Sequence, residues 1–335
     1  MFRGFRGSLA STMRALVYNY DTRVVEKPLP PIPRGWVLVR VEWAAWTGLE
    51  EAIVTGRLGA RPGIVVGHAG YGVVVELGVA APSWLAGKKV AVGRLPAPYT
   101  IPLYREKLWA LMDEVAPLPG IVYNGWFAEY VALPSSALTE ITIGLEDEKY
   151  YALSTPAAIA MVAAHWLATR TRGERYAVVG GGLVAIMTAL AAQEVYDYEL
   201  TLYTSDLRWK RLAEELGVQI EHVKKLGDHT RPLAAVFIAT LDAYDSYRAV
   251  ESVRRDGDVL LHPVYVYETP PALPRCNYRL ITSFPADTGV YLLRKLGCKK
   301  LEKLVAVVDV LERPPIPRPK PALIVRVGAG KTGKS

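Results

Sequence analysis

The chain has 335 residues, 51% of them hydrophobic, which indicates about two domains with packed cores. No apolar run reaches the ~18 residues that a membrane span needs, and two cysteines are too few for a disulfide framework or a cysteine zinc cage. The net charge of +7 does not indicate a nucleic-acid partner, because Arg3, Arg6, Lys331 and Lys334 lie in the tails and the remaining charges are mixed in sign.

The N-terminal part of the chain has the pattern of an all-β unit. Residues 1–12, MFRGFRGSLAST, are basic but lack the apolar core of a secretory signal, so we expect a flexible leader and a cytoplasmic protein. From 13 to about 135, short β-branched runs are broken by Pro and Gly. Strands are predicted at MRALVY (13–18), WVLVRVEWAA (36–45), GYGVVVEL (70–77) and KKVAVG (88–93).

From about residue 153 the pattern changes to alternating helices and strands. Such alternation with fully apolar strands predicts a parallel sheet covered on both faces, an α/β fold. Helices are predicted at 154–170, 183–195, 207–217, 242–255 and near 287–311. Strands are predicted at 176–182, 199–205, 233–240, 256–264, 278–283 and, as PALIVRV, at 321–327.

The C-terminal sequence GAGKTGKS, Gly328 to Ser335, matches the phosphate-loop pattern G-x-x-x-x-G-K-[ST] and follows a strand. That loop functions at the N-terminus of a helix, whose backbone N–H groups hold the phosphates. Because no helix follows in this sequence, we expect a basic, disordered tail here, and neither an ATPase nor a GTPase.

A dinucleotide site is predicted where the strand YAVVGGG leads into the helix LVAIMTALAAQEV. Gly180-x-Gly182-x-x-Ala185 fits the glycine fingerprint, in which Gly180 permits a tight turn and Gly182 lets the backbone approach a pyrophosphate. Leu183 and Val184, at the start of the helix, are assigned to the same site. The alternative is a turn of a parallel sheet that binds nothing.

The end of the next strand favours NADP over NAD. Thr204 stands 22 residues after Gly182, where an acid would bind the ribose of NAD, and Ser205 and Arg208 follow it. Hydroxyls and an arginine suit a 2′-phosphate, although Asp206 lies close by and NAD stays the alternative. Thr240, at the end of the strand LAAVFIAT, is also assigned to cofactor binding.

From 13 to 327 the chain resembles the medium-chain dehydrogenase/reductase family, the zinc alcohol dehydrogenase-like proteins. The likeness rests on GHAGYGVVVELG, on GWFAEYVALP, on the glycine fingerprint and on the order of segments. It implies a GroES-like β domain and a Rossmann doubly wound parallel sheet, with the active-site cleft between them. The implied boundaries are 1–152 for the catalytic domain, 153–297 for the dinucleotide-binding domain and 298–335 for the return to the catalytic domain.

The residues that hold zinc in this family are replaced here. The resemblance aligns Thr47 with the family's cysteine, Glu50 with its aspartate and Ala69 with the glutamate that follows the histidine, and only His68 is kept. One imidazole and a hydroxyl cannot supply three or four zinc ligands. The stretch 93–120, which aligns with the structural zinc lobe, contains no cysteine. We therefore expect no zinc in either site.

Two functions stay open. The first is a zinc-free, NADP(H)-dependent oxidoreductase acting on a small carbonyl, enone or quinone, with Thr47, His68 and Glu50 as candidate catalytic residues. The second is a catalytically silent nucleotide-binding sensor or assembly subunit. For His68 itself, the sequence favours a histidine satisfied by hydrogen bonds within a glycine-rich turn, and the alternative is a proton donor or substrate contact.

Composition and the family resemblance also predict the growth temperature of the source and the oligomeric state. Two glutamines, three asparagines and 24 prolines are typical of a thermophile. The family resemblance implies a homodimer or homotetramer, in which NYRLITSF (277–284) pairs with its twin across a two-fold axis. The alternative is a monomer whose edge is covered by the loop VYVYETPPALP (264–274).

Overall fold

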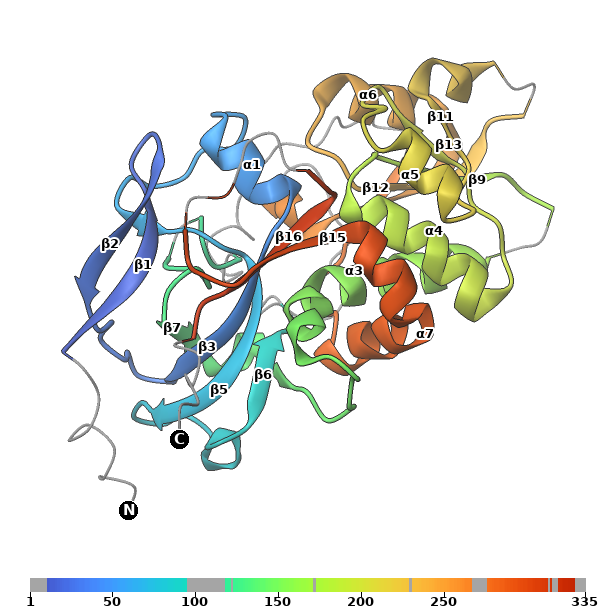
Figure 1. Ribbon diagram of the computed structural model, residues 1–335. Helices are drawn as coiled ribbons and strands as arrows, with labels where there is room; N and C mark the ends of the chain where they lie inside the picture. The colour runs from blue at the N-terminus through green and yellow to red at the C-terminus, as the bar shows by residue number, and fades with distance from the viewer. Residues whose placement is uncertain are drawn as a thin grey trace. The chain divides into compact units, whose positions relative to one another are not determined.

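The computed structural model describes residues 11–94, 118–121, 123–170, 173–228, 231–266, 276–312, 314 and 319–328. Within these residues the chain forms two compact units, each with a large sheet of its own (Figure 1). The first unit takes the described parts of Met1–Val92, Leu118–Ser154 and Val305–Ser335. The second takes the described parts of Gly93–Pro117 and Thr155–Leu304.

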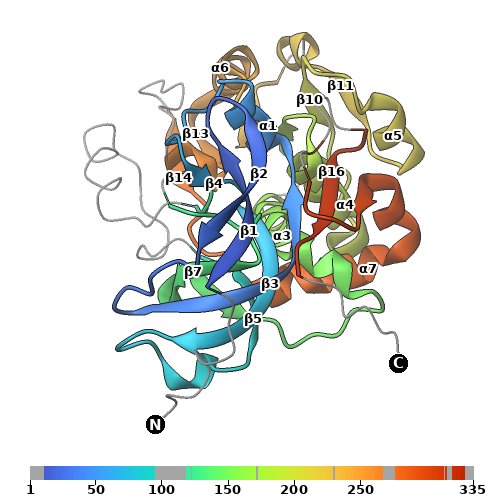
Figure 2. The same cartoon turned by 60° about the vertical axis from the view of Figure 1, so that its left-hand side comes forward.

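The first unit is organised around β3 (Trp36–Trp46), a long strand rich in β-branched and aromatic residues. The order along its seven-stranded sheet is β15-β16-β3-β5-β6-β8, and β7 also pairs with β3. The other strands are β5 (Ala69–Leu77), β6 (Lys89–Val92), β7 (Tyr130–Pro134), β8 (Leu138–Glu140), β15 (Val305–Val308) and β16 (Ala322–Arg326). In Figure 2 the red strand β16 lies against the blue strand β3, where Leu323 is paired antiparallel with Trp46.

A smaller sheet with the order β2-β1-β4 completes the β structure of the first unit. Its strands are β1 (Thr12–Tyr18), β2 (Thr22–Pro28) and β4 (Ile64–Val65). The helical elements of this unit are α1 (Gly48–Val54) and the short 3₁₀ helices η2 (Ser83–Leu85), η3 (Ser135–Ala137) and η4 (Glu148–Leu153). The four strands predicted in this part of the chain are all present, so the all-β assignment is confirmed.

The second unit contains a six-stranded parallel sheet with the order β11-β10-β9-β12-β13-β14. Its strands are β9 (Tyr176–Val179), β10 (Leu202–Thr204), β11 (Ile220–His222), β12 (Leu233–Ile238), β13 (Val253–Leu261) and β14 (Asn277–Leu280). The helical elements are α3 (Ser154–Ala168), α4 (Leu183–Tyr196), α5 (Lys210–Glu215), η5 (Val223–Gly227), α6 (Ala243–Glu251), η6 (Pro263–Val266) and α7 (Ala286–Leu304).

The strand order explains why the central strands are wholly apolar. The connection from β9 through α4 runs toward one edge of the sheet, and the connection from β12 through α6 runs toward the other. Because such crossovers are right-handed, α4 and α6 cover opposite faces. All six residues of β12 are buried. The predicted Rossmann doubly wound sheet is confirmed.

Two predicted helices end at least four residues earlier than the sequence suggested, because a strand begins there. The helix predicted at 242–255 ends at Glu251, because Val253 already pairs with Leu233 and β13 continues through a bulge at Asp256, whose φ is +62°. The helix predicted near 287–311 ends at Leu304, because the β-branched residues of Val305–Val308 form β15 against β16.

Several predictions fall outside the described residues. They concern the leader as far as residue 10, residues 95–117 of the stretch aligned with the structural zinc lobe, residues 267–274 of the loop before β14, and the tail from residue 329.

One segment of the described chain is long and apolar enough to cross a membrane by length and composition. It is Glu148–Ala168, which contains η4 and α3. Because 78% of its most apolar window is buried inside the protein, it has the character of a core helix.

Candidate functional site

Thr47 starts α1 and forms a capping box with Glu50. The Thr47 hydroxyl accepts a hydrogen bond from the backbone N–H of Leu49 at 3.3 Å, and the Glu50 carboxylate accepts one from the backbone N–H of Thr47 at 2.8 Å. This reciprocal arrangement satisfies N–H groups that a helix start leaves unpaired. The T-x-x-E spacing of a capping box is visible in the sequence, so α1 was a helix that could have been predicted.

Glu50 is the centre of a buried polar cluster that joins two of the predicted site residues. Its Oε2 accepts from the backbone N–H of Thr47 and, at 3.0 Å, from the Thr47 hydroxyl. Its Oε1 accepts from the backbone N–H of His68 at 2.9 Å and lies 2.5 Å from His68 Nδ1. The Thr47, Glu50 and His68 residues are therefore in direct contact in the fold.

The surroundings of Glu50 keep it ionised. Burial alone would raise its pKa, but the charge of His68 and the hydrogen bonds from His68 and Thr47 lower that pKa from 4.5 to about 2. An ionised carboxylate can only accept hydrogen bonds, so the network assigns a proton to His68 Nδ1. His68 Nε2 is then the ring atom through which the imidazole can exchange a proton.

The glycines around His68 are required by packing. Gly67 has φ +110°, and a Cβ atom there would lie 2.5 Å from the Phe127 ring. A Cβ atom on Gly70 would lie 2.9 Å from the Trp126 ring, and the backbone N–H of Trp126 donates to the Gly67 carbonyl at 3.0 Å. The turn is therefore pressed against a neighbouring segment, and Glu50 holds the histidine within it.

In the second unit, the fingerprint glycines lie between β9 and α4 as predicted, and they differ in what surrounds them. Gly180 has φ +139°, and a Cβ atom there would lie 2.8 Å from the carbonyl oxygen of Ala239. Gly182 is the N-cap of α4, has no side-chain capping bond, and no described protein atom lies within 4 Å of its would-be Cβ. Leu183 and Val184 form the first turn, whose N–H groups have no partner within a helix.

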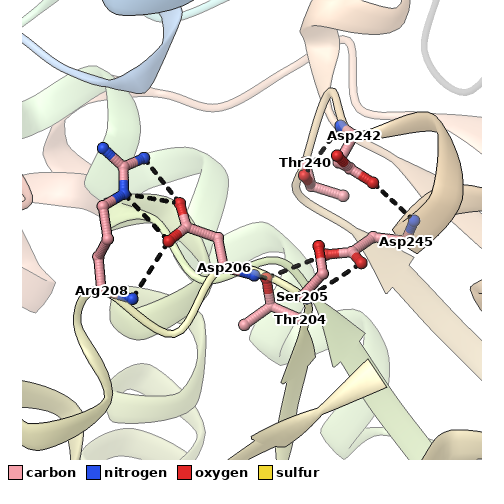
Figure 3. A network of polar contacts seen from close by, with 7 residues as sticks. All are labelled: Thr204, Ser205, Asp206, Arg208, Thr240, Asp242 and Asp245. Carbon is pink, nitrogen blue, oxygen red and sulfur yellow. Dashed lines mark hydrogen bonds and ion pairs between the residues drawn. The ribbon is translucent and has the colours of Figure 1, made fainter. Parts of the chain in front are cut away.

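Thr204 ends β10, and its side chain is bound to a residue of α6 (Figure 3). The Thr204 hydroxyl donates to Asp245 Oδ2 at 2.9 Å, and the Ser205 backbone N–H donates to both Asp245 oxygens at 3.0 and 2.9 Å. Asp245 is only 1% exposed. A carboxylate that α6 supplies from 41 residues along the chain therefore lies next to Thr204 at this strand end.

Arg208 lies beyond the same strand end and is paired with Asp206 (Figure 3). Arg208 Nε donates to both oxygens of Asp206, at 3.0 and 2.9 Å, and Nη2 donates to Oδ2 at 2.6 Å. The backbone N–H of Asp206 in turn donates to the Thr204 hydroxyl at 3.0 Å. Thr204, Ser205 and Arg208 are therefore brought together, with two carboxylates among them.

Thr240 follows β12 at the same carboxyl edge of the sheet and is part of the start of α6. Its hydroxyl accepts from the backbone N–H of Asp242 at 3.1 Å, and Asp242 caps the helix by accepting from the backbone N–H of Asp245 at 2.9 Å. The Tyr265 hydroxyl donates to the Thr240 carbonyl at 2.7 Å. In parallel sheets of this kind, ligands bind outside the carboxyl ends of the strands.

Comparison with known proteins agrees with this architecture. The profile of the alcohol dehydrogenase GroES-like domain matches residues 33–143, a range that includes Thr47, Glu50 and His68. The L-threonine 3-dehydrogenase of Chelativorans sp. is 30% identical over 216 residues, which are 62% of this chain and 61% of that protein. Over these segments the chain resembles the medium-chain dehydrogenase/reductase family.

Solved structures share the fold of this chain. A short chain alcohol dehydrogenase of Escherichia coli CFT073, complexed with NADH, superposes with a TM-score of 0.67 at 16% identity and covers 95% of this chain and 100% of its own. A structure from Sinorhizobium meliloti 1021 bound to NADP has a TM-score of 0.65 at 18% identity, with the same two coverages of 95% and 100%. The sequence matches span only 44% to 61% of the length of the curated relatives.

The side chains that the family resemblance aligns with catalytic zinc ligands do not fit zinc. The Thr47 hydroxyl hydrogen is donated to Glu50, and Glu50 is saturated by four hydrogen bonds. His68 Nε2 is left as the one suitable donor atom of this set, and zinc needs three or four. Across the described part of the chain, no group of three or more His, Cys, Asp or Glu residues is placed to hold a metal ion.

Proposed function

We propose that the chain is a zinc-independent, nicotinamide-dependent oxidoreductase that transfers hydride to or from a small carbonyl, enone or quinone. The observation that carries the proposal is the environment of Gly182. No described protein atom requires a glycine there, whereas a pyrophosphate approaching the first turn of α4 would. The residues present thus fit a dinucleotide.

The residues that would hold the dinucleotide follow from this position. The backbone N–H groups of Leu183 and Val184 would bind the pyrophosphate, and Thr240 lies at the same edge of the sheet. Arg208 supplies the positive charge that favours the 2′-phosphate of NADP(H), and NAD(H) is the alternative cofactor. Related folds have been solved with NADH and with NADP.

A bound nicotinamide ring would donate or accept the hydride. His68 is the residue we assign to the proton that accompanies it, because Glu50 holds Nδ1–H and leaves Nε2 to exchange a proton with the substrate. Thr47 and Glu50 act as positioning residues, since their polar groups bind each other and His68. Without a Lewis acid, conjugated enones and quinones are favoured, because their charge spreads into an enolate or phenolate.

The test is an assay of NADPH and NADH oxidation with a panel of enones, quinones, aldehydes and ketones. Turnover that depends on His68 supports the proposal. Tight binding of either nucleotide with no turnover on any substrate would instead favour the silent nucleotide-binding sensor. Absence of binding by both nucleotides would contradict both functions.

Zinc independence has its own measurement. Elemental analysis of the purified protein after mild chelation should give far less than one zinc per chain, and activity should survive the treatment. About one retained zinc per chain would overturn this part of the proposal. A cytoplasmic location and a homodimeric or homotetrameric assembly belong to the same proposal.

A further inference from the structure

The turn after β10 holds a charged pair at the place where the dinucleotide's adenosine ribose is expected. Asp206 and Arg208 are two residues apart, and their side chains are 43% and 39% exposed. The carboxylate binds the guanidinium through both oxygens and also accepts from the Arg208 backbone N–H at 3.1 Å. The arginine that would bind a 2′-phosphate is therefore already paired in the free protein (Figure 3).

The backbone beneath this pair is fixed from two sides. Buried Asp245 binds the Thr204 hydroxyl and the Ser205 backbone N–H, and the same hydroxyl holds the backbone N–H of Asp206. On the other side, a Cβ atom on Gly181 would lie 2.7 Å from the carbonyl oxygen of Asp206, so the turn packs directly on the fingerprint loop. The exposed side chains can reorient, but the turn that carries them cannot easily move.

We propose that Asp206 is a specificity-determining residue whose carboxylate competes with the cofactor's 2′-phosphate for the Arg208 guanidinium. When NADP(H) binds, its 2′-phosphate replaces the Asp206 carboxylate as the partner of Arg208. NAD(H), which lacks this phosphate, binds with the Asp206–Arg208 pair intact. This inference rests on the proposed function and adds the ion pair that sets the relative affinity for NADP(H) and NAD(H). Asp245 is no competitor, because it is buried and bound to the turn.

The experiment replaces Asp206 in the full chain and measures binding instead of turnover. Asp206→Asn removes the charge and keeps an oxygen that can accept from the Arg208 backbone N–H. Calorimetric titration with adenosine 2′,5′-bisphosphate and with 5′-AMP isolates the adenosine end, and NADPH and NADH are titrated alongside. We expect adenosine 2′,5′-bisphosphate and NADPH to bind about three- to tenfold more tightly, with 5′-AMP and NADH within about twofold of the parent.

A matched control separates this effect from a general change in charge. Glu215→Gln removes one negative charge and breaks a surface pair with Arg211, whose Nε lies 3.0 Å from Glu215 Oε1, on α5 of the same unit. Glu215→Gln should change neither the ratio of NADPH to NADH affinity nor the ratio of adenosine 2′,5′-bisphosphate to 5′-AMP affinity. In the double variant Asp206→Asn with Arg208→Ala, the gain in NADPH affinity should disappear.

Three results would overturn the inference. An unchanged NADPH-to-NADH ratio in Asp206→Asn, and equally in Asp206→Ser as a second variant, would show that the pair does not compete. A loss of NADH affinity in both variants would make Asp206 a ribose ligand. If neither nucleotide binds the parent protein, the proposed function fails together with the inference, whereas binding with an unchanged ratio removes the inference alone.

Discussion

The carboxylate of Glu50 and the imidazole of His68 lie 2.5 Å apart in the interior of the first unit, although 18 positions separate them in the chain. The contact ties α1 to the turn that precedes β5, and both side chains are almost without solvent exposure, at 0% for Glu50 and 4% for His68. Ionic contacts in such surroundings are costly to break from one side only.

The stability of the protein should fall between pH 4.5 and about 2 because of Glu50. Its pKa in the folded state, about 2, lies below its ordinary value of 4.5, so its stabilising contribution is complete above pH 4.5 and is lost as the pH falls through 2. The loss should be on the order of 3 kcal/mol. Denaturant unfolding at several pH values measures it.

Glu50→Gln should destabilise the protein by about 3–5 kcal/mol at pH 7, because an amide cannot accept from four donors. Its unfolding free energy should also change less between pH 4.5 and 2. Glu140→Gln, which breaks the surface pair with Lys88 in the same unit, should cost less than about 1 kcal/mol. Equal costs for the two variants would contradict a special role for Glu50.

Removing His68 Nε2 while keeping the bond to Glu50 should abolish most turnover. In His68→Asn, the side-chain amide can stand in for Nδ1–H, so the fold should be retained while kcat falls about 10²- to 10⁴-fold on a substrate that needs a proton. His68→Gln places its amide nearer the Nε2 position and is the matched variant. A kcat within twofold of the parent in His68→Asn would mean that the histidine only fills the turn.

Substitution of the two fingerprint glycines should have different effects, on stability at Gly180 and on dinucleotide binding at Gly182. Gly180→Ala should lower the unfolding free energy by about 1–3 kcal/mol, because its φ of +139° and the Ala239 carbonyl both oppose a Cβ atom. Gly182→Ala should cost less than about 1 kcal/mol but weaken dinucleotide binding tenfold or more. Thermal unfolding and titration with NADPH and NADH measure the two effects. Unchanged affinity in Gly182→Ala would contradict the assigned site.

Light scattering should give a mass of twice or four times the 36.8 kDa chain. β14 pairs with β13 on one side, and the Ile281 N–H donates toward Leu261, so alternation directs the Tyr278 N–H away from β13. Tyr278→Pro should therefore yield a folded monomer, while Arg279→Pro also damages the β13 pairing. A parent protein that is monomeric at micromolar concentration would exclude pairing through this edge.

Local patterns predicted the elements well, and contacts between distant segments could not be predicted from them. The apolar run of β12 and the glycines before α4 identify a parallel sheet and its turn from neighbouring residues alone. The residues near Thr204 in the sequence do not predict its hydrogen bond with Asp245, because that contact depends on how α6 crosses the sheet. The partnership of Glu50 with His68 has the same origin, since each residue belongs to a separate local pattern.

The pairing of β16 with β3 has a consequence for the order of events during synthesis. Leu323 is synthesised long after its partner Trp46, with a delay of about 15–55 s at ordinary elongation rates. During that interval β3 lacks one neighbour, whereas the strands of the parallel sheet, from Tyr176 to Leu280, are all synthesised before Leu323. The first unit is thus completed after the strands of the second, and until then the unpaired edge of β3 is exposed to aggregation.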